Sequence, residues 1–143
     1  MLKKMRNHIK NQSGLTLIEL LAVVVILGII SAIAVPSIGG LIDNTKKDAH
    51  VANAQQMINA AKIHVTSQPD DIGDLSLEDM IEEGLIESFD DPDGGNYNEE
   101  TSSVTVNKAG NAYTYTVTLI GSERSVTGVE GAIDRDDVTE NTP

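Results

Sequence analysis

The apolar residues of this 143-residue chain are concentrated in one unbroken run near its start. Residues 15–35 read LTLIELLAVVVILGIISAIAV and contain a single charged side chain, Glu19. A helix needs roughly 20 predominantly apolar residues to cross the hydrocarbon core of a bilayer. The run therefore predicts a membrane-spanning helix. Basic residues lie before it and none directly after, which predicts a cytoplasmic N-terminus.

The helical pattern continues beyond the apolar run. Pro36 is expected to end or kink the first helix, because proline lacks an N–H and clashes with the preceding turn. Apolar positions then recur at spacings of three and four residues from Val51 to Val65, which is typical of a helix with one buried face. This predicts a stem helix over residues 36–67 that stops before Pro69. We expect His50 and His64 on it to be ordinary surface or boundary side chains.

The remainder of the chain predicts a small helix-loop-sheet region over residues 68–129. A short helix is expected over 75–83, capped by Asp74 or Ser76 and stopped by Gly84. Strict alternation of apolar and threonine residues over 113–119 predicts a strand. Further strands are expected over 103–107 and 124–129, with a turn over 108–111, and residues 130–143 are expected to form a flexible tail. The predicted fold class is α+β, with an antiparallel sheet packed on the stem helix.

Charge is strongly segregated along the sequence. The chain has 10 basic and 22 acidic residues, and four of the basic ones precede residue 15. The rest of the chain therefore carries 6 − 22 = −16, which repels phosphate backbones and disfavours direct nucleic-acid binding. There is no cysteine for a disulfide or a thiolate site. No nucleophile–base pair and no glycine-rich phosphate loop is recognisable, so the sequence does not predict an enzyme.

One acidic loop is a candidate metal site. Asp90, Asp91 and Asp93 offer carboxylate oxygens, which are the ligands that calcium prefers. The spacing does not follow the EF-hand pattern, because Gly95 occupies the position of its fifth ligand. The alternative interpretation is a solvated acidic turn that binds no ion. Apart from possible calcium binding at this loop, the sequence predicts no cofactor.

Two interpretations of the N-terminal segment are open from the residues alone. A basic start, an apolar run and the sequence Ala32-Ile33-Ala34 also suit a secretory signal that is removed by cleavage. Against this interpretation, Pro36 would lie second after the cut. Glu19 would also lie in the apolar run without a role, although an intramembrane carboxylate costs on the order of 2.5–3.5 kcal/mol at the bilayer centre and is usually functional.

The segment SGLTLIELL, residues 13–21, resembles the type IV prepilin signal when it is taken with the basic leader before it and the apolar helix after it. The resemblance implies cleavage between Gly14 and Leu15 by a prepilin peptidase, and N-methylation of Leu15. It implies that Glu19 is the assembly glutamate and that Pro36 is the helix-kinking proline. Leu15 departs from the phenylalanine that is usual at the first mature position. The implied organisation is a leader over 1–14, a transmembrane and filament-core helix over 15–35, and the stem, head region and tail given above.

What the resemblance implies about function is a structural subunit that polymerises into a type IV pilus-like filament or a pseudopilus. The implied partners are copies of itself, other pilins, a prepilin peptidase, a polytopic assembly platform and an assembly ATPase. The implied location is the cell membrane, as a single-pass protein with a cytoplasmic N-terminus before processing, and afterwards a surface or envelope filament. Missing cysteines and a threonine-rich hairpin favour a single-membraned bacterium and a role in DNA uptake or a pilus. The alternative is a membrane-anchored extracellular binding module that does not polymerise.

Overall fold

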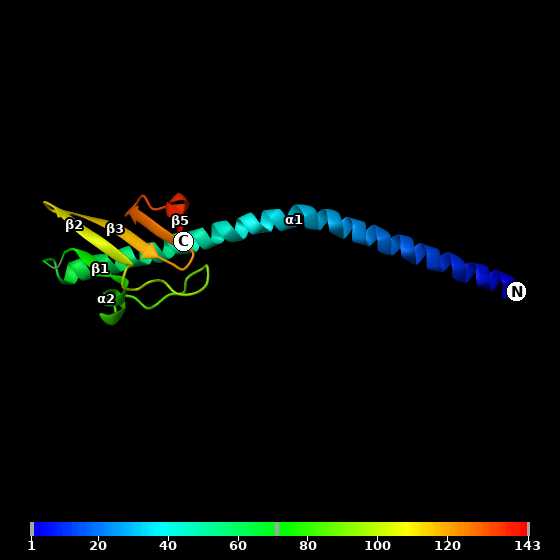
Figure 1. Cartoon of the computed structure of the whole chain (residues 1–143), viewed down its shortest axis with the longest axis horizontal. Helices are drawn as coiled ribbons and strands as arrows, with labels where there is room; N and C mark the ends of the chain where they lie inside the picture. The colour runs from blue at the N-terminus through cyan, green and yellow to red at the C-terminus, as the bar shows by residue number, and fades with distance from the viewer. Residues whose placement is uncertain (1, 71, 143) are drawn as a thin grey trace. The chain divides into compact units, whose positions relative to one another are not determined.

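The computed structural model describes residues 2–70 and 72–142, with side chains described from residue 16 onward. The chain divides into two compact units, Met1–Ile42 and Asp43–Pro143. We call the second unit the head. Figure 1 shows the order of the elements along the chain.

The first unit consists of the N-terminal part of helix α1, which spans Leu2–Ser67 and contains Pro36. The helix is uninterrupted at Pro36, so of the two expected outcomes, an end or a kink, the helix does not end there, and the kink stays a prediction. A single proline removes one backbone donor, and the flanking turns keep their own hydrogen bonds. The helix from Thr16 onward is long and apolar enough to cross a membrane. Its large apolar side chains are exposed, for example Leu17 at 69% and Ile33 at 70%.

The head contains a five-stranded antiparallel sheet in the order β1-β2-β3-β4-β5. The strands are β1 (Asp74–Ser76), β2 (Ser103–Ala109), β3 (Ala112–Ile120), β4 (Arg124–Val129) and β5 (Val138–Glu140). The α+β class and the β4 bounds are as predicted. The turn between β2 and β3 is tighter than predicted, because Ala109 pairs with Ala112 and only Gly110 and Asn111 remain between the strands.

Two edge strands were not expected. β1 pairs with β2, and β5 pairs with β4. The prediction of a flexible tail over 130–143 is wrong for its central part, which forms the 3-10 helix η1 (Arg135–Asp137) and then β5. The physical reason is Val138, which lies opposite Val126 and is only 5% exposed. One buried valine and the ladder hydrogen bonds hold this otherwise polar segment on the sheet.

Helix α2 (Leu77–Glu82) is shorter than the predicted helix over 75–83. Ser76 caps it, and the side chain of Asp79 completes a reciprocal capping box. Leu75 belongs to β1 instead, where it pairs with Val104. Gly84 follows the helix at a φ of 69°, as expected for a residue that stops a helix in the left-handed region.

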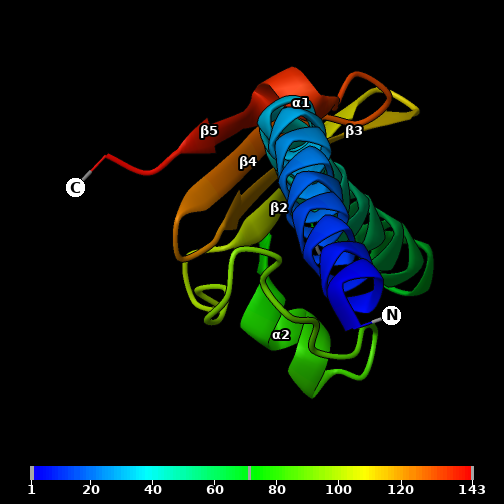
Figure 2. The ribbon, with the colours of Figure 1, turned by 90° about the vertical axis from the view of Figure 1, so that its right-hand side faces the viewer.

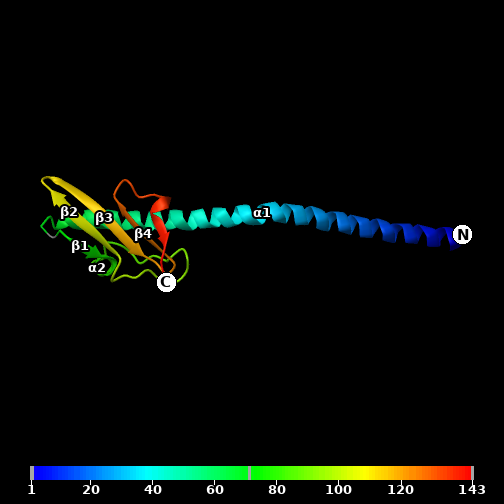
Figure 3. The same cartoon turned by 45° about the horizontal axis from the view of Figure 1, so that its top comes forward.

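A single hydrophobic core joins the C-terminal part of α1 to the sheet. Figures 2 and 3 show the strands side by side along one side of this part of the helix. In this core the apolar face predicted for α1 packs on the apolar face predicted for β3, so the periodicity of α1 and the alternation in β3 are confirmed. The fully buried members include Met57, Ile58, Met80, Val117 and Leu119. Each such side chain contributes about 1.5–3 kcal/mol by burial.

Candidate functional site

The predicted cleavage position lies between Gly14 and Leu15, inside the helical backbone of α1. The surroundings of these two residues lie outside what the structure describes, which covers side chains from residue 16 onward. The predicted leader, residues 1–14, ends five positions before the first charged side chain that the structure does describe, Glu19.

Glu19 is an exposed carboxylate among exposed apolar side chains. Its neighbours Ile18 and Leu20 are 67% and 61% exposed. Within residues 16–70 and 72–142, no side chain forms an ion pair with Glu19. A carboxylate in apolar surroundings is costly unless a cation or a hydrogen-bond donor meets it. Glu19 is therefore suited to pair with a positive group supplied by another molecule.

A second group of polar and titratable side chains lies buried or half-buried in the head, and we call it the His50 cluster: His50, Asn53, Asp91, Asp93 and Tyr97. Nε2 of His50 lies 2.9 Å from Oδ2 of Asp93 and 3.6 Å from Oδ1 of Asp91. The Tyr97 hydroxyl lies 2.7 Å from Nδ1 of His50. Asn53 Nδ2 donates to Tyr97 at 3.1 Å, which leaves the tyrosine proton for the imidazole. The cluster thus ties α1 to the irregular segment between α2 and β2.

Two basic side chains lie near the Asp93 carboxylate in addition to the His50 imidazole. Lys46 Nζ lies 3.3 Å from its Oδ1, and Arg124 Nε lies 3.7 Å from its Oδ2. Burial alone would raise the pKa of the Asp93 carboxyl, but hydrogen bonds from His50 and Lys46 and the charge of Arg124 hold that pKa below its ordinary value. Burial likewise raises the pKa of Tyr97 to about 12, and the negative charges of Asp91 and Asp93 act in the same direction, against the Asn53 hydrogen bond.

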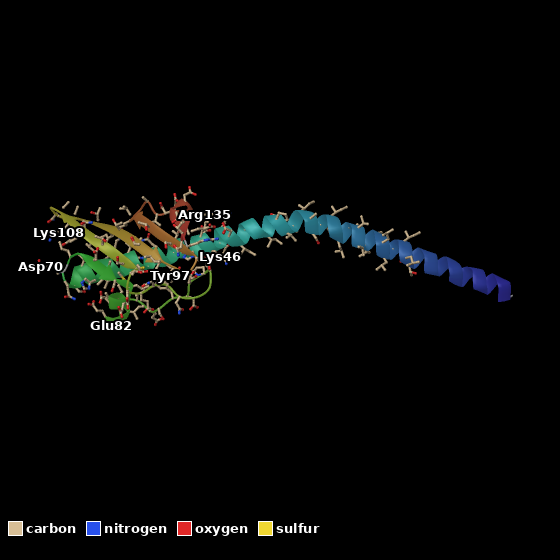
Figure 4. The ribbon with its side chains drawn as sticks, in the orientation of Figure 1. Lys46, Asp70, Glu82, Tyr97, Lys108 and Arg135 are labelled. Atoms are coloured by element: carbon tan, nitrogen blue, oxygen red, sulfur yellow. The ribbon has the colours of Figure 1, made fainter. Side chains whose placement is uncertain are left out.

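Asp91 connects the cluster to the turn between β3 and β4. Its carboxylate accepts hydrogen bonds from the Asp93 N–H, the Ser122 N–H and the Ser122 hydroxyl. Gly121 packs against this carboxylate so closely that an added Cβ would lie 2.7 Å from Asp91 Oδ2. Figure 4 shows Lys46, Tyr97 and Arg135 toward one end of the head, with Asp70 and Lys108 toward the other.

The structure only partly brings together the residues predicted to bind calcium. Asp91 and Asp93 lie close to each other, whereas Asp90 is exposed and is not part of the group. The third potential ligand is His50, and one ligand atom from each residue lies within 4.8 Å of the others. A ring nitrogen does not suit the all-oxygen preference of calcium. Lys46 and Arg124 also already supply positive charge to Asp93.

The prediction that His50 and His64 are surface or boundary residues is wrong. They are 0% and 4% exposed, and His64 Nδ1 lies 3.0 Å from Glu83 Oε2. A signal for His50 was present in the sequence, since it precedes Ala54 and Ile58 by four and eight residues and so shares their buried face. Nothing local in the sequence indicated that Tyr97 and Asp93 would meet it.

A comparison with family models matches residues 9–35 to the prokaryotic N-terminal methylation motif. No curated protein and no solved structure matches the chain. The matched segment includes Gly14, Leu15 and Glu19, and it ends just before Pro36. A long apolar N-terminal helix followed by a five-stranded antiparallel sheet is also a pilin-like arrangement. The chain therefore carries the prepilin-type methylation signal of type IV pilins over residues 9–35, followed by a pilin-like arrangement of helix and sheet.

Proposed function

We propose that this protein is cleaved between Gly14 and Leu15, methylated at Leu15, and polymerised into a type IV pilus-like filament or pseudopilus. The observation that carries the proposal is Glu19, an exposed carboxylate in an apolar helix within the matched motif. Removal of residues 1–14 takes away four basic residues and leaves a new amino group at Leu15.

The chemistry of assembly follows from these two groups. The amine of Leu15 is cationic, and the carboxylate of Glu19 on a neighbouring copy is anionic. Their attraction is strong in a low-dielectric environment. Pairing removes an uncompensated intramembrane charge from each copy and fixes the axial register between neighbours. The proposed partners are further copies and other pilins, with a prepilin peptidase, an assembly platform and an assembly ATPase acting on the precursor and the growing filament.

The test is Glu19→Ala in the native host, with exposed Glu99→Ala in the head as the matched control. We expect Glu19→Ala to be cleaved and inserted normally, because removing the carboxylate lowers the cost of insertion, and to form no filaments. Glu99→Ala is expected to assemble as the wild type does. Normal filament numbers from Glu19→Ala would contradict the pairing.

A membrane-anchored binding module is the alternative of a different class. It also predicts an inserted apolar helix, but it predicts that neither the wild type nor Glu99→Ala is recovered in sheared filaments. We further propose that the filament serves in DNA uptake. It is tested by the transformation frequency of a strain that lacks the gene.

A further inference from the structure

A cavity of about 580 Å³ lies between α2 and the irregular segment that leads to β2. This volume falls within the range of about 300–1,000 Å³ that is usual for ligand pockets in proteins. Figures 1 and 2 show α2 and this segment together on one side of the head, away from β5. Four apolar or aromatic side chains line the cavity: Leu77, Ile81, Phe89 and Tyr97. Leu77 and Tyr97 belong to the hydrophobic core, so the cavity reaches the edge of that core.

Carboxylates surround this apolar lining. Glu78, Asp90, Glu99 and Glu100 line the same cavity, and all four residues are exposed. Within residues 16–70 and 72–142, none of these four carboxylates forms an ion pair. Among the described residues that line the cavity, none is basic. The cavity therefore combines an apolar lining with four negative charges that no cation of the head neutralises.

The walls of the cavity are held in place by contacts within the head. The Glu78 N–H donates a hydrogen bond to the carbonyl oxygen of Glu99 at 3.1 Å, which joins the first turn of α2 to the opposite wall. Phe89 packs edge to face on Tyr97 with ring centroids 5.4 Å apart, and the Tyr97 hydroxyl is fixed by His50. A site whose walls are fixed before binding loses little conformational entropy when a ligand enters.

Two other cavities of the head lack this combination of features. The cavity beside β4 and β5 is lined by Lys46 and Arg124 as well as by carboxylates, so both signs of charge are present in it. In the cavity beside β1, the Glu83 carboxylate lies 3.0 Å from His64, and Asp79 completes the capping box of α2. Their carboxylates are therefore already used within the head.

The charge around the cavity determines the sign of its ligand. Residues 69–100 contain 13 acidic and no basic residues, out of the 21 acidic residues in residues 43–143. A cationic ligand would relieve the mutual repulsion of these carboxylates, whereas an anionic ligand would add to it. The cavity is therefore suited to a cation.

A second copy of the head is a poor source of that cation, because its basic side chains are already used. Five of the six form ion pairs within their own head: Lys46–Asp93, Lys47–Asp43, Lys62–Glu130, Arg124–Asp43 and Arg135–Asp48. The sixth, Lys108, lies over the Tyr113 ring. The cation that fits the cavity is therefore expected on a different molecule.

The arrangement of apolar and acidic side chains indicates what kind of cation fits. A bare ammonium group on the apolar lining would lose its hydration without gaining a partner. An apolar side chain with lysine or arginine on either side can instead place its apolar part against Ile81 and Phe89 and its charges near the carboxylates. This is the pattern of a basic peptide segment with one apolar anchor.

We propose that this cavity binds a basic segment of a partner protein. One apolar side chain of the segment occupies the cavity, and the lysine or arginine side chains that flank it pair with the surrounding carboxylates, Glu78, Asp90, Glu99 and Glu100. The inference goes beyond the proposed filament and does not depend on it, because the cavity lies within a single head.

Peptide binding to the detergent-solubilised full chain tests the proposal. The probes are two fluorescein-labelled synthetic peptides with the same lysines, one with a central leucine and the other with a central serine. Fluorescence anisotropy is measured at about 0.15 M salt, where the Debye length is about 8 Å. We expect the leucine peptide to bind about tenfold more tightly, which corresponds to about 1.4 kcal/mol. Equal affinities of the two peptides, or no binding of either, would overturn the proposal.

Paired charge removal separates the cavity from the acidic segment as a whole. Glu99→Gln with Glu100→Gln removes two carboxylates that line the cavity, whereas Glu82→Gln with Glu87→Gln removes two exposed carboxylates of the same segment outside it. Both variants lose the same charge and should keep the wild-type melting temperature. We expect the first to weaken binding of the leucine peptide about tenfold and the second less than about twofold. An equal loss in both would place the attraction on the whole segment and overturn the assignment to the cavity.

Thiol protection gives an independent readout, because the chain has no cysteine of its own. Ser88 is exposed and lines the cavity, so the leucine peptide should slow maleimide labelling of Ser88→Cys. Labelling of Asn107→Cys in β2 should stay unchanged. Unaltered labelling of Ser88→Cys by saturating peptide would contradict binding at this site.

Spermidine tests a small cation as the alternative occupant. Displacement of the leucine peptide by spermidine at concentrations near the Kd of the peptide would overturn the assignment to a peptide segment. Glu19→Ala should bind the leucine peptide as the wild type does. Loss of filaments therefore bears only on the proposed function, and failure of the peptide to bind bears only on this inference.

Discussion

His50 on α1 lies 2.9 Å from the carboxylate of Asp93, although 43 residues separate them in the chain. This contact holds the long irregular segment between α2 and β2 against the head part of α1. Because His50 is fully buried, the pair is part of the structure of the head and not a surface feature. It makes the head dependent on a polar network as well as on its apolar core.

His50→Ala should therefore destabilise the head by about 2–4 kcal/mol, because it leaves a void and removes a partner from Asp93 and Tyr97. The measurement is urea unfolding of the detergent-solubilised chain, followed by near-ultraviolet circular dichroism. Gln56→Ala, at an exposed position of the same helix, should change the unfolding free energy by less than about 0.5 kcal/mol. Equal effects of the two substitutions would contradict a structural role for the imidazole.

The pH dependence of stability follows from Asp93. Its pKa in the folded head lies below the ordinary value of 3.8. The stabilisation that it contributes is therefore fully present above about pH 4 and is lost as the pH falls through the folded pKa. We expect the melting temperature of the wild type to fall more steeply below pH 4 than that of Asp93→Asn. Parallel acid profiles for the two proteins would show that the Asp93 carboxylate carries no net stabilisation.

Much of the fold was predictable because it depends on local pattern. The 3-and-4 spacing of Val51 to Val65 and the alternation of Tyr113 to Leu119 specified which faces of the helix and the strand are buried. Edge strands β1 and β5 were not predictable in this way. Each has only three residues, and each exists because a neighbouring strand offers unpaired backbone groups.

Of the two candidate sites, one depends on local sequence and the other on the fold. The motif around Gly14 and Glu19 is contiguous, so its residues can be recognised without a structure. The His50 cluster is assembled from the helix α1 and the loop before β2, and its contacts depend on the fold. Asp90 shows the limit of reasoning from composition, because it adjoins Asp91 in sequence but is exposed and takes no part in the cluster.

Gly121→Ala should destabilise the head by about 2–4 kcal/mol, because the new methyl group meets a backbone carbonyl oxygen and the Asp91 carboxylate. Gly110→Ala is the comparison, since its φ of 64° strains an alanine but no atom lies within 4 Å of the added Cβ. It should cost about 1–2 kcal/mol. In an Asp91→Ala background the penalty at Gly121 should shrink, and a double-mutant cycle measures that coupling. Strict additivity would contradict the contact.

Calcium should stabilise the head only by general screening. The carboxylates of Asp91 and Asp93 already have partners, while the acidic residues around them repel one another. We expect calcium, magnesium and sodium at matched ionic strength to raise the melting temperature equally. The Asp91→Asn, Asp93→Asn double variant should show the same increments from its own lower starting value. A response to calcium alone that the double variant loses would instead establish a specific site.

The processing of the N-terminus tests the account of this chain as a pilin-like subunit most directly. The measurement is the intact mass of the protein purified from its native membrane, with tandem fragmentation of the N-terminal peptide. The account predicts a mature chain that begins at Leu15 and carries one methyl group on its amine, and it predicts uncleaved precursor for Gly14→Ala. A mature chain that begins at Val35 would contradict the account and support ordinary secretion.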